Sequence, residues 1–191
     1  MKKLLFVLLL GLSGCGGVDA GSQSTDKQVL PGEEKNVFVF SLDQFIDEYN
    51  NNIDNIHDDV EKRPSHLITD DEFYKTAKNN YVNVFVKEVD NDSEKSYKIA
   101  GLYNKDKILT GMNISVDIIP DKDKIFKSSK KGTRAAYSML KSLGFEEDTL
   151  QKALEKADPV YSVSNDICEM KFILQPSEHK YIIEFKPKVR S

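Results

Sequence analysis

The feature that most constrains the fold is an alternation of apolar and polar residues between Ile108 and Ile118. The apolar positions are occupied by Ile, Met and Val, and small or polar residues stand between them: Gly111, Asn113, Ser115 and Asp117. Successive side chains of a strand point to opposite faces of a sheet, so this pattern predicts a strand with one buried face and one wet face. Such a strand must bury its apolar face against another layer.

Four more runs predict strands and complete the sheet. The runs at 81–89 and 96–103 flank a polar turn and predict a hairpin, because both are rich in Val, Ile and aromatic residues. The runs at 168–174 and 181–185 predict a second hairpin in the same way. Together with 108–118 they predict an antiparallel sheet of about five strands.

The longest predicted helix lies at the start of the domain. Ser41 and Gln44 have the spacing of a capping box, in which each side chain bonds the other's backbone N–H. Apolar residues then follow at steps of three and four and predict a helix of about nineteen residues: Leu42, Phe45, Ile46, Tyr49, Ile53, Ile56 and Val60. This stripe covers the sheet or pairs with another chain as a coiled coil, and we favour the first because two and a half heptads are short for a coiled coil.

Three shorter helices are predicted further along the chain. A second capping box begins at Thr69 and predicts a helix through Ala77. Helical spacing at 132–143 ends at Gly144, a residue suited to the positive φ of a helix stop. A further short helix is predicted at 150–157, before Pro159. The predicted fold class is therefore α+β, with the antiparallel sheet covered on one face by the long N-terminal helix and a short helical pair.

The face of the long helix opposite its apolar stripe is acidic. Its carboxylates are Asp43, Asp47, Glu48, Asp54, Asp58 and Asp59. The plain explanation is a solvated helix face, and the functional one is a surface for a protein partner, since so many carboxylates create a local field. A small basic tail at Lys186, Lys188 and Arg190 would either meet these acids within the molecule or face a membrane.

The first fourteen residues have the parts of an export signal. Lys2 and Lys3 form a positive start, and the stretch at 4–12 is almost unbroken apolar. About nine apolar residues are too few for a helix to cross a bilayer, which takes about twenty. The segment therefore predicts a cleaved leader.

Leu12-Ser13-Gly14-Cys15 resembles the lipobox of bacterial lipoproteins. The resemblance implies cleavage between Gly14 and Cys15, lipid on the Cys15 thiol and acylation of the new amino terminus. Several acyl chains on one residue would anchor the protein firmly in the cell membrane, facing the periplasm or the exterior. Gly16 after the cysteine resembles lipoproteins sent to the outer membrane, where the source has one. The alternative is an ordinary signal peptide with a cysteine near its cut.

The chain thus divides into a leader at 1–14, a lipidated cysteine and flexible tether at 15–35, and one globular α+β domain at 36–191. The tether is rich in Gly and Ser, and a coil of about twenty such residues spans about 25 Å, which predicts a domain that hangs clear of the lipid. Loss of the leader removes two lysines and no acid, so the net charge falls from -4 to -6. An acidic domain gives no reason to expect nucleic acid, or a domain lying flat on an anionic membrane.

No catalytic residue, metal site or cofactor is predicted. His57, His66 and His179 are isolated from any other ligand at metal-binding spacing, and no nucleophile elbow, phosphate loop or dinucleotide fingerprint occurs. The run from Asp90 to Glu94 resembles the start of a calcium loop, but Lys95 stands where glycine is needed, which favours a hairpin turn. Cys168 lies on an apolar face and is expected to be a core thiol.

These observations favour a membrane-anchored lipoprotein whose domain binds or inhibits a protein partner in the cell envelope. The alternative is a carrier or receptor with a small-ligand cavity between helix and sheet, lined by Phe45, Tyr49, Phe85, Phe172 and Phe185. Core packing explains the same aromatics. A hydrolase built from scattered residues is the least favoured class.

Overall fold

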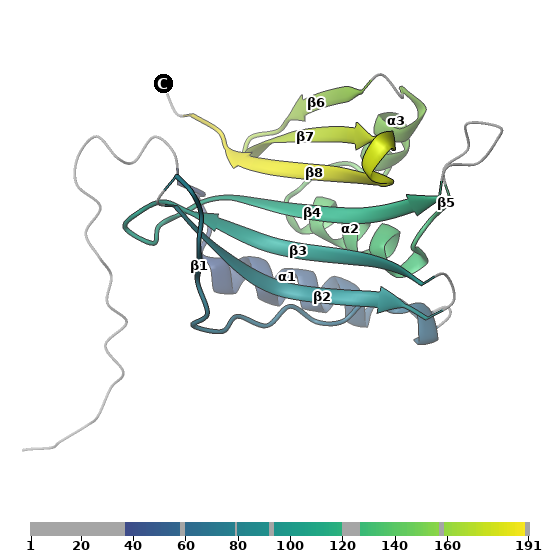
Figure 1. Ribbon diagram of the computed structural model, residues 1–191, viewed down its shortest axis with the longest axis horizontal. Helices are drawn as coiled ribbons and strands as arrows, with labels where there is room; N and C mark the ends of the chain where they lie inside the picture. Colours follow the sequence, from purple (N-terminus) through teal and green to yellow (C-terminus); the bar gives the residue numbers. More distant parts are fainter. Residues whose placement is uncertain are drawn as a thin grey trace, which may run out of the picture.

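A computed structural model describes residues 37–57, 60–78, 80–91, 94–119, 127–156 and 159–189. The leader, the lipobox with Gly14 and Cys15, and the tether lie outside the described residues, as do Asp58, Asp59 and Arg190. The α+β class is confirmed: an antiparallel sheet carries three α-helices behind one face (Figure 1).

Seven strands form the sheet in the order β1-β2-β3-β4-β8-β7-β6, with every neighbouring pair antiparallel. Their bounds are β1 Tyr74–Lys75, β2 Tyr81–Asp90, β3 Lys95–Tyr103, β4 Leu109–Ile119, β6 Val160–Ser164, β7 Cys168–Gln175 and β8 Lys180–Pro187. The two-residue β5, Lys127–Ser128, pairs with the end of β4. The prediction of about five strands was wrong in number, because β1 and β6 at the two edges were missed.

The predicted long N-terminal helix is shorter than expected. The helix α1 spans Leu42–Asp54, and its capping box is present, with Gln44 N–H donating to Ser41 Oγ at 3.2 Å. The chain leaves the helix at Asn55, and the guanidinium of Arg63 folds back to donate to the carbonyl of Ile56 at 2.7 Å. A run of three asparagines has low helix propensity, and α1 ends two residues after it. Val60 belongs to a short 3₁₀ turn, Val60–Lys62, instead.

The helix predicted from Thr69 is absent, and that prediction was wrong. The Asp70 carboxylate accepts from the Glu72 N–H at 3.0 Å, a local turn that competes with helix formation. The carbonyl of Asp70 is also taken by the Asn83 side-chain amide of β2, at 2.7 Å. The segment therefore runs extended into β1.

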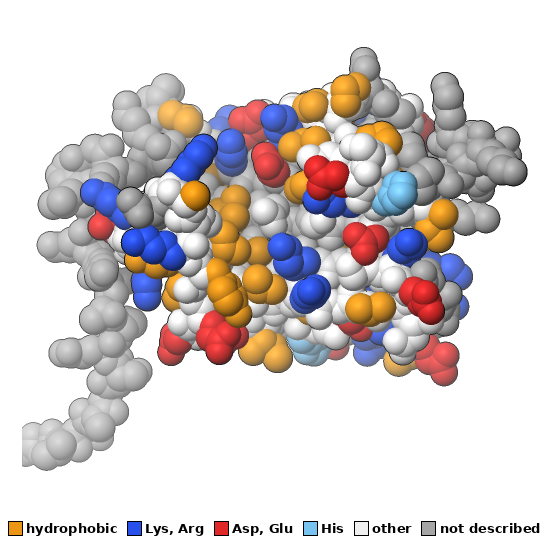
Figure 2. All heavy atoms as spheres, in the orientation of Figure 1, with side chains coloured by type: hydrophobic (Ala, Val, Ile, Leu, Met, Phe, Trp, Pro, Cys, Tyr) orange, Lys and Arg blue, Asp and Glu red, His pale blue; other side chains and the backbone are white. Residues whose placement is uncertain are grey.

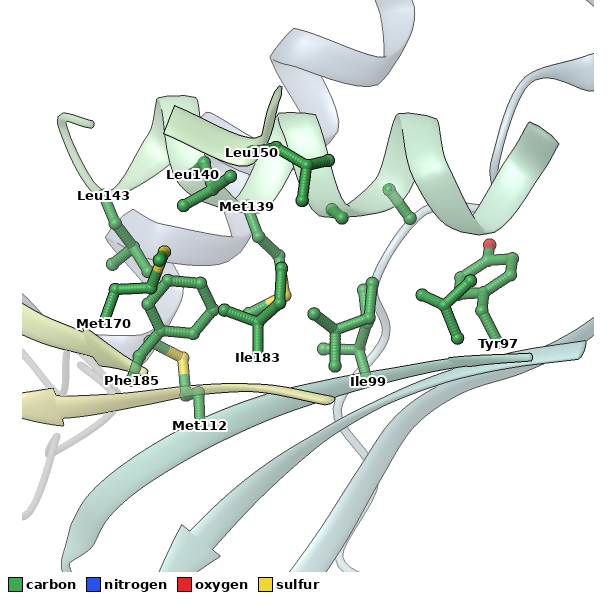
Figure 3. Packing of buried hydrophobic residues seen from close by; sticks show 14 of the residues in the cluster. Tyr97, Ile99, Met112, Met139, Leu140, Leu143, Leu150, Met170, Ile183 and Phe185 are labelled. Atoms are coloured by element: carbon green, nitrogen blue, oxygen red, sulfur yellow. The ribbon is translucent and has the colours of Figure 1, made fainter. Parts of the chain in front are cut away.

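The later helices lie near their predicted positions. The helix α2 spans Lys130–Ser142 and α3 spans Thr149–Glu155, and Gly144 adopts the expected positive φ, at 74°. One hydrophobic cluster joins the three helices to the inner face of the sheet. Figure 3 shows side chains of the sheet, among them Ile99, Met112 and Phe185, meeting Met139 and Leu140 of α2.

The other face of the sheet carries no helix among the described residues. Its side chains are mixed, and Figure 2 shows apolar, basic and acidic groups side by side on it. The register places Lys171, Ile173, Ile182 and Glu184 on this face, next to one another across β7 and β8. This open face leaves a second surface of the domain in contact with solvent.

Candidate interaction surfaces

Four carboxylates of the predicted acidic face lie on α1 within the described residues. Asp43, Asp47, Glu48 and Asp54 are all exposed. Asp54 is partly neutralised, because its Oδ1 lies 2.9 Å from His66 Nε2 and 4.0 Å from a guanidinium nitrogen of Arg63. The other three carboxylates make no ion pair within the described part of the chain.

A groove lies beside this face, between α1, α2 and the loop that follows α2. It is an open hollow of about 490 Å³. Its lining residues are Asn52, Asn55, Ile56, Arg134, Tyr137, Ser138, Leu140, Lys141, Phe145, Glu146 and Glu147. Glu48 shares a flank of α1 with Asn52 and Asn55, because residues four and seven apart lie on one side of a helix. One exposed carboxylate of the acidic face therefore lies one helical turn from the lining of the groove.

The floor of the groove is polar and ordered. The side chain of Asn52, which is 8% exposed, donates to Ser142 Oγ at 2.9 Å. Ser142 Oγ in turn donates to the carbonyl of Ser138 at 2.7 Å. These two linked hydrogen bonds hold α1 against α2 and fix the distance between the helices on either side of the groove. The asparagines at 50 and 52 are thus structural, since Asn50 also pairs with the backbone of Leu67 through both ends of its amide.

The walls of the groove combine apolar and charged groups. Tyr137 is 39% exposed, Ile56 and Phe145 are half-buried, and Lys141 faces the same hollow as Glu147. Such a surface offers an aromatic anchor within a rim of charges, the arrangement typical of protein contact sites. Sequence reasoning missed it because its walls come from segments about eighty residues apart, which no local pattern connects.

A second charged cluster lies inside the domain and is structural. Glu88 of β2 accepts hydrogen bonds from the Lys131 ammonium at 2.6 Å, the Tyr97 hydroxyl at 2.5 Å and the Ser65 N–H at 3.0 Å. Burial raises the pKa of Glu88, but these three hydrogen bonds lower it by more, so the net pKa lies below its usual value. Burial raises the pKa of Tyr97, as do the nearby Tyr49 and Glu88.

The neighbouring Asp90 fixes the start of α2. Its carboxylate is 2% exposed and accepts from the Ser129 hydroxyl at 3.1 Å and the Lys130 N–H at 2.9 Å. Ser129 is the cap residue, and its Oγ accepts from the Gly132 N–H at 3.0 Å. An acid here satisfies helix-end donors and complements the helix dipole. Asp90 therefore joins the end of β2 to the start of α2. The sequence around Asp90 did not indicate this role.

The three histidines and Cys168 lie in different surroundings. His57 and His179 are exposed, and His66 pairs with Asp54. Within the ranges the structure describes, no group of three metal-binding side chains occurs. Cys168 is fully buried, as expected, and burial raises the pKa of its thiol to about 12. A neutral buried thiol is inert.

The five aromatics considered for a ligand cavity lie in the core. Phe45, Tyr49, Phe85, Phe172 and Phe185 are each at most 4% exposed and belong to the same hydrophobic cluster. Phe172 stacks on Tyr181 with ring centroids 5.2 Å apart. Packing within the core therefore accounts for these residues.

No helix of the described residues is long and apolar enough to cross a membrane. The chain matches no protein-family model, no curated protein and no solved structure.

Proposed function

We propose that this protein is a membrane-anchored lipoprotein whose globular domain binds a protein partner in the cell envelope. The anchor rests on the lipobox at Leu12–Cys15, which implies lipid on Cys15 and a domain facing the periplasm or the exterior. The binding role rests on one observation: an ordered groove with an exposed Tyr137, one helical turn along α1 from the exposed carboxylate of Glu48.

The groove itself is lined by both basic and acidic residues, Arg134, Lys141, Glu146 and Glu147, and further carboxylates lie on the neighbouring face of α1. These charges favour a partner segment that carries both apolar and charged side chains. The carboxylates of Asp43, Asp47 and Glu48 attract a basic approach surface and raise the rate of encounter. Tyr137 and Phe145 then supply the apolar contact that holds a partner. The partner side is expected to present an apolar or aromatic side chain flanked by lysine or arginine.

A photo-crosslinking amino acid tests the groove directly. Benzoyl-phenylalanine is placed at position 137, instead of Tyr137, in the full chain expressed in cells. The matched control places the same residue at position 74, because Tyr74 is also exposed but lies in β1, away from the groove. We expect a discrete protein adduct from position 137 and none from position 74. Glu48→Lys should weaken that adduct. Recovery of the domain alone from position 137 would overturn the binding role.

The anchor is tested separately by mass spectrometry of the native amino terminus. We expect a chain that begins at a lipid-modified Cys15, and Cys15→Ala should leave residues 1–14 attached. A native protein that keeps its leader would contradict the anchor.

A small-ligand site is the alternative function. The groove volume of about 490 Å³ lies within the range of small-molecule pockets. In that case the crosslinker at position 137 would give no protein adduct. The protein purified from cells would carry a bound compound that mass spectrometry detects.

A further inference from the structure

The strand order brings three separate lysine-bearing segments to one end of the sheet. Because neighbours are antiparallel, the start of β2, the end of β3, the start of β4 and the end of β8 lie together: Tyr81 pairs with Tyr103, and Met112 pairs with Phe185. The turn before β2, the turn between β3 and β4, and the tail after β8 therefore meet. We call this the tether end, comprising residues 74–81, 103–109 and 184–189.

The chain also enters the domain at this end. Leu42, at the start of α1, lines a small hollow together with Asn83 and Tyr103. The described chain begins five residues earlier, at Val37, and Figure 1 shows the start of α1, β1 and the end of β8 on the same side. Residues 15–36, which connect the domain to Cys15, therefore join it at the tether end.

Six exposed lysines stand on the tether end, two on each segment: Lys75, Lys78, Lys105, Lys107, Lys186 and Lys188. Lys188 pairs at 3.7 Å with the fully exposed Asp166, and Lys107 lies 4.4 Å from the ring centre of Phe73. The other four make no ion pair with described residues. Four exposed or half-buried acids lie among these lysines, namely Asp106, Asp166, Glu169 and Glu184, and Glu169 is the register partner of Lys186. Figure 2 shows basic side chains gathered at the left, where these segments lie.

The acids near this end lie on both of its sides, with Glu169 and Glu184 on the open face. Asp70 and Asp71 line the same small hollow as Leu42, on the α1 side. Lys78 and Lys186 lie on the open face of the sheet, whereas Lys107 lies over the ring of Phe73, which lines the same hollow as Asp70 and Asp71.

A hollow of about 580 Å³ opens among these lysines on the open face. Lys78, Lys186 and one acid, Glu184, line it together with the apolar side chains of Val82 and Leu102. Gly111 lies at the bottom of the hollow and has no side chain to fill it. A Cβ there would lie 3.1 Å from the Phe185 carbonyl oxygen and 3.4 Å from Leu102 Cδ1. Two ammonium groups above an apolar floor match a phosphate joined to a hydrocarbon chain.

We propose that the tether end binds anionic phospholipid headgroups of the membrane in which the chain is anchored. This inference rests on the proposed lipid at Cys15, and it replaces the expectation from the sequence that the domain hangs clear of the lipid. The eleven residues of β4 extend over about 36 Å, whereas a Gly-rich coil of about twenty residues, as predicted for the tether from its composition, would span about 25 Å. The opposite end reaches the membrane only if the tether folds back along the whole domain. The lysine surface is thus the one presented to lipid, and the acidic remainder is repelled from it.

Vesicle binding tests the proposal without the anchor. The chain of residues 16–191 is mixed with vesicles of phosphatidylcholine alone or with about 30% phosphatidylglycerol. We expect binding to the anionic vesicles only. The triple variant K78E/K105E/K186E should reduce the affinity about tenfold or more. The control K87E/K98E/K130E carries the same charge change on exposed lysines away from the tether end, and it should reduce the affinity less than about threefold.

Each outcome decides the question. Equal losses in the two triple variants, or equal binding to neutral vesicles, would overturn the proposal. Competition by inorganic phosphate at constant ionic strength would assign the lysines to free phosphate instead of membrane lipid. The assay uses no lipidated cysteine and no partner, so its failure leaves the crosslinking and mass spectrometry results standing, and the reverse also holds.

Discussion

The two ends of the sheet use the same residue types in opposite ways. At the end where β2 finishes and α2 begins, which we call the cap end, Glu88, Asp90 and Lys131 are paired and largely removed from solvent. At the tether end, lysines such as Lys78 and Lys186 are exposed and make no ion pair with described residues. Charges at the cap end maintain the fold, and those at the tether end remain available for a binding partner.

The charges at the two ends differ in pairing because their surroundings differ. Asp90 faces the unsatisfied N–H groups at the start of α2, where a carboxylate replaces the water lost on burial. Lys78 lies in a turn at the end of a sheet, with solvent around its ammonium. Buried charges require partners, and exposed charges do not. Stability should therefore respond to the cap end and hardly at all to the tether end.

The largest effect is expected from Asp90→Ala. It leaves the Ser129 hydroxyl and the Lys130 N–H without their buried acceptor, and should lower the free energy of unfolding by about 2 to 3 kcal/mol. Asp106→Ala, an exposed turn aspartate of the tether end, is the control and should change it by less than about 0.5 kcal/mol. Urea denaturation measures both. Similar losses from the two variants would break the comparison of the two ends.

A smaller, pH-dependent effect is expected from Glu88→Gln. The pKa of Glu88 in the folded chain lies below its ordinary value of 4.5, so its contribution to stability is present above that pH. That contribution is lost as the pH falls through the lowered pKa. Wild type should therefore lose more stability than Glu88→Gln between about pH 5 and pH 2. Urea denaturation at several pH values in this range measures the free energy of unfolding of both proteins. If the two free energies fall in parallel with pH, Glu88 is not ionised and paired as described.

The smallest effect on stability is expected from K78E/K105E/K186E. No described ion pair is lost, so the free energy of unfolding should change by less than about 0.5 kcal/mol per residue. The same variant should lose binding to anionic vesicles. A strongly destabilised triple variant would mean that the tether end also maintains the fold, and the contrast with the cap end would fail.

Much of the sheet could be predicted from the sequence, because a period of two is a local property. The strand at β4 alternates between the core and a wet face, and β7 and β8 repeat the pattern. The capping box at Ser41 was also correct, since it involves residues three apart. The short edge strand β6 was missed, because five residues with two half-buried side chains give a weak signal.

The errors arose where distant residues decide the local structure. The predicted helix at Thr69 gives way to an extended segment, where Asn83 of β2 binds the Asp70 carbonyl. The helix α1 stops at Asp54, and Arg63 returns to the Ile56 carbonyl just beyond its end. The groove beside α1 was not predicted, because Asn52 and Tyr137 meet only through the packing of two helices.

The sequence by itself determined the alternating strands, the apolar stripe of α1, the inert surroundings of Cys168 and the resemblance of the amino terminus to a lipoprotein leader. Only the tertiary structure decided which carboxylates are buried, where the groove lies and that six lysines from three segments share one end. The physical reason is that periodicity and capping depend on residues a few positions apart. The environment of a charge depends on strand order and helix packing, which join residues far apart in the chain.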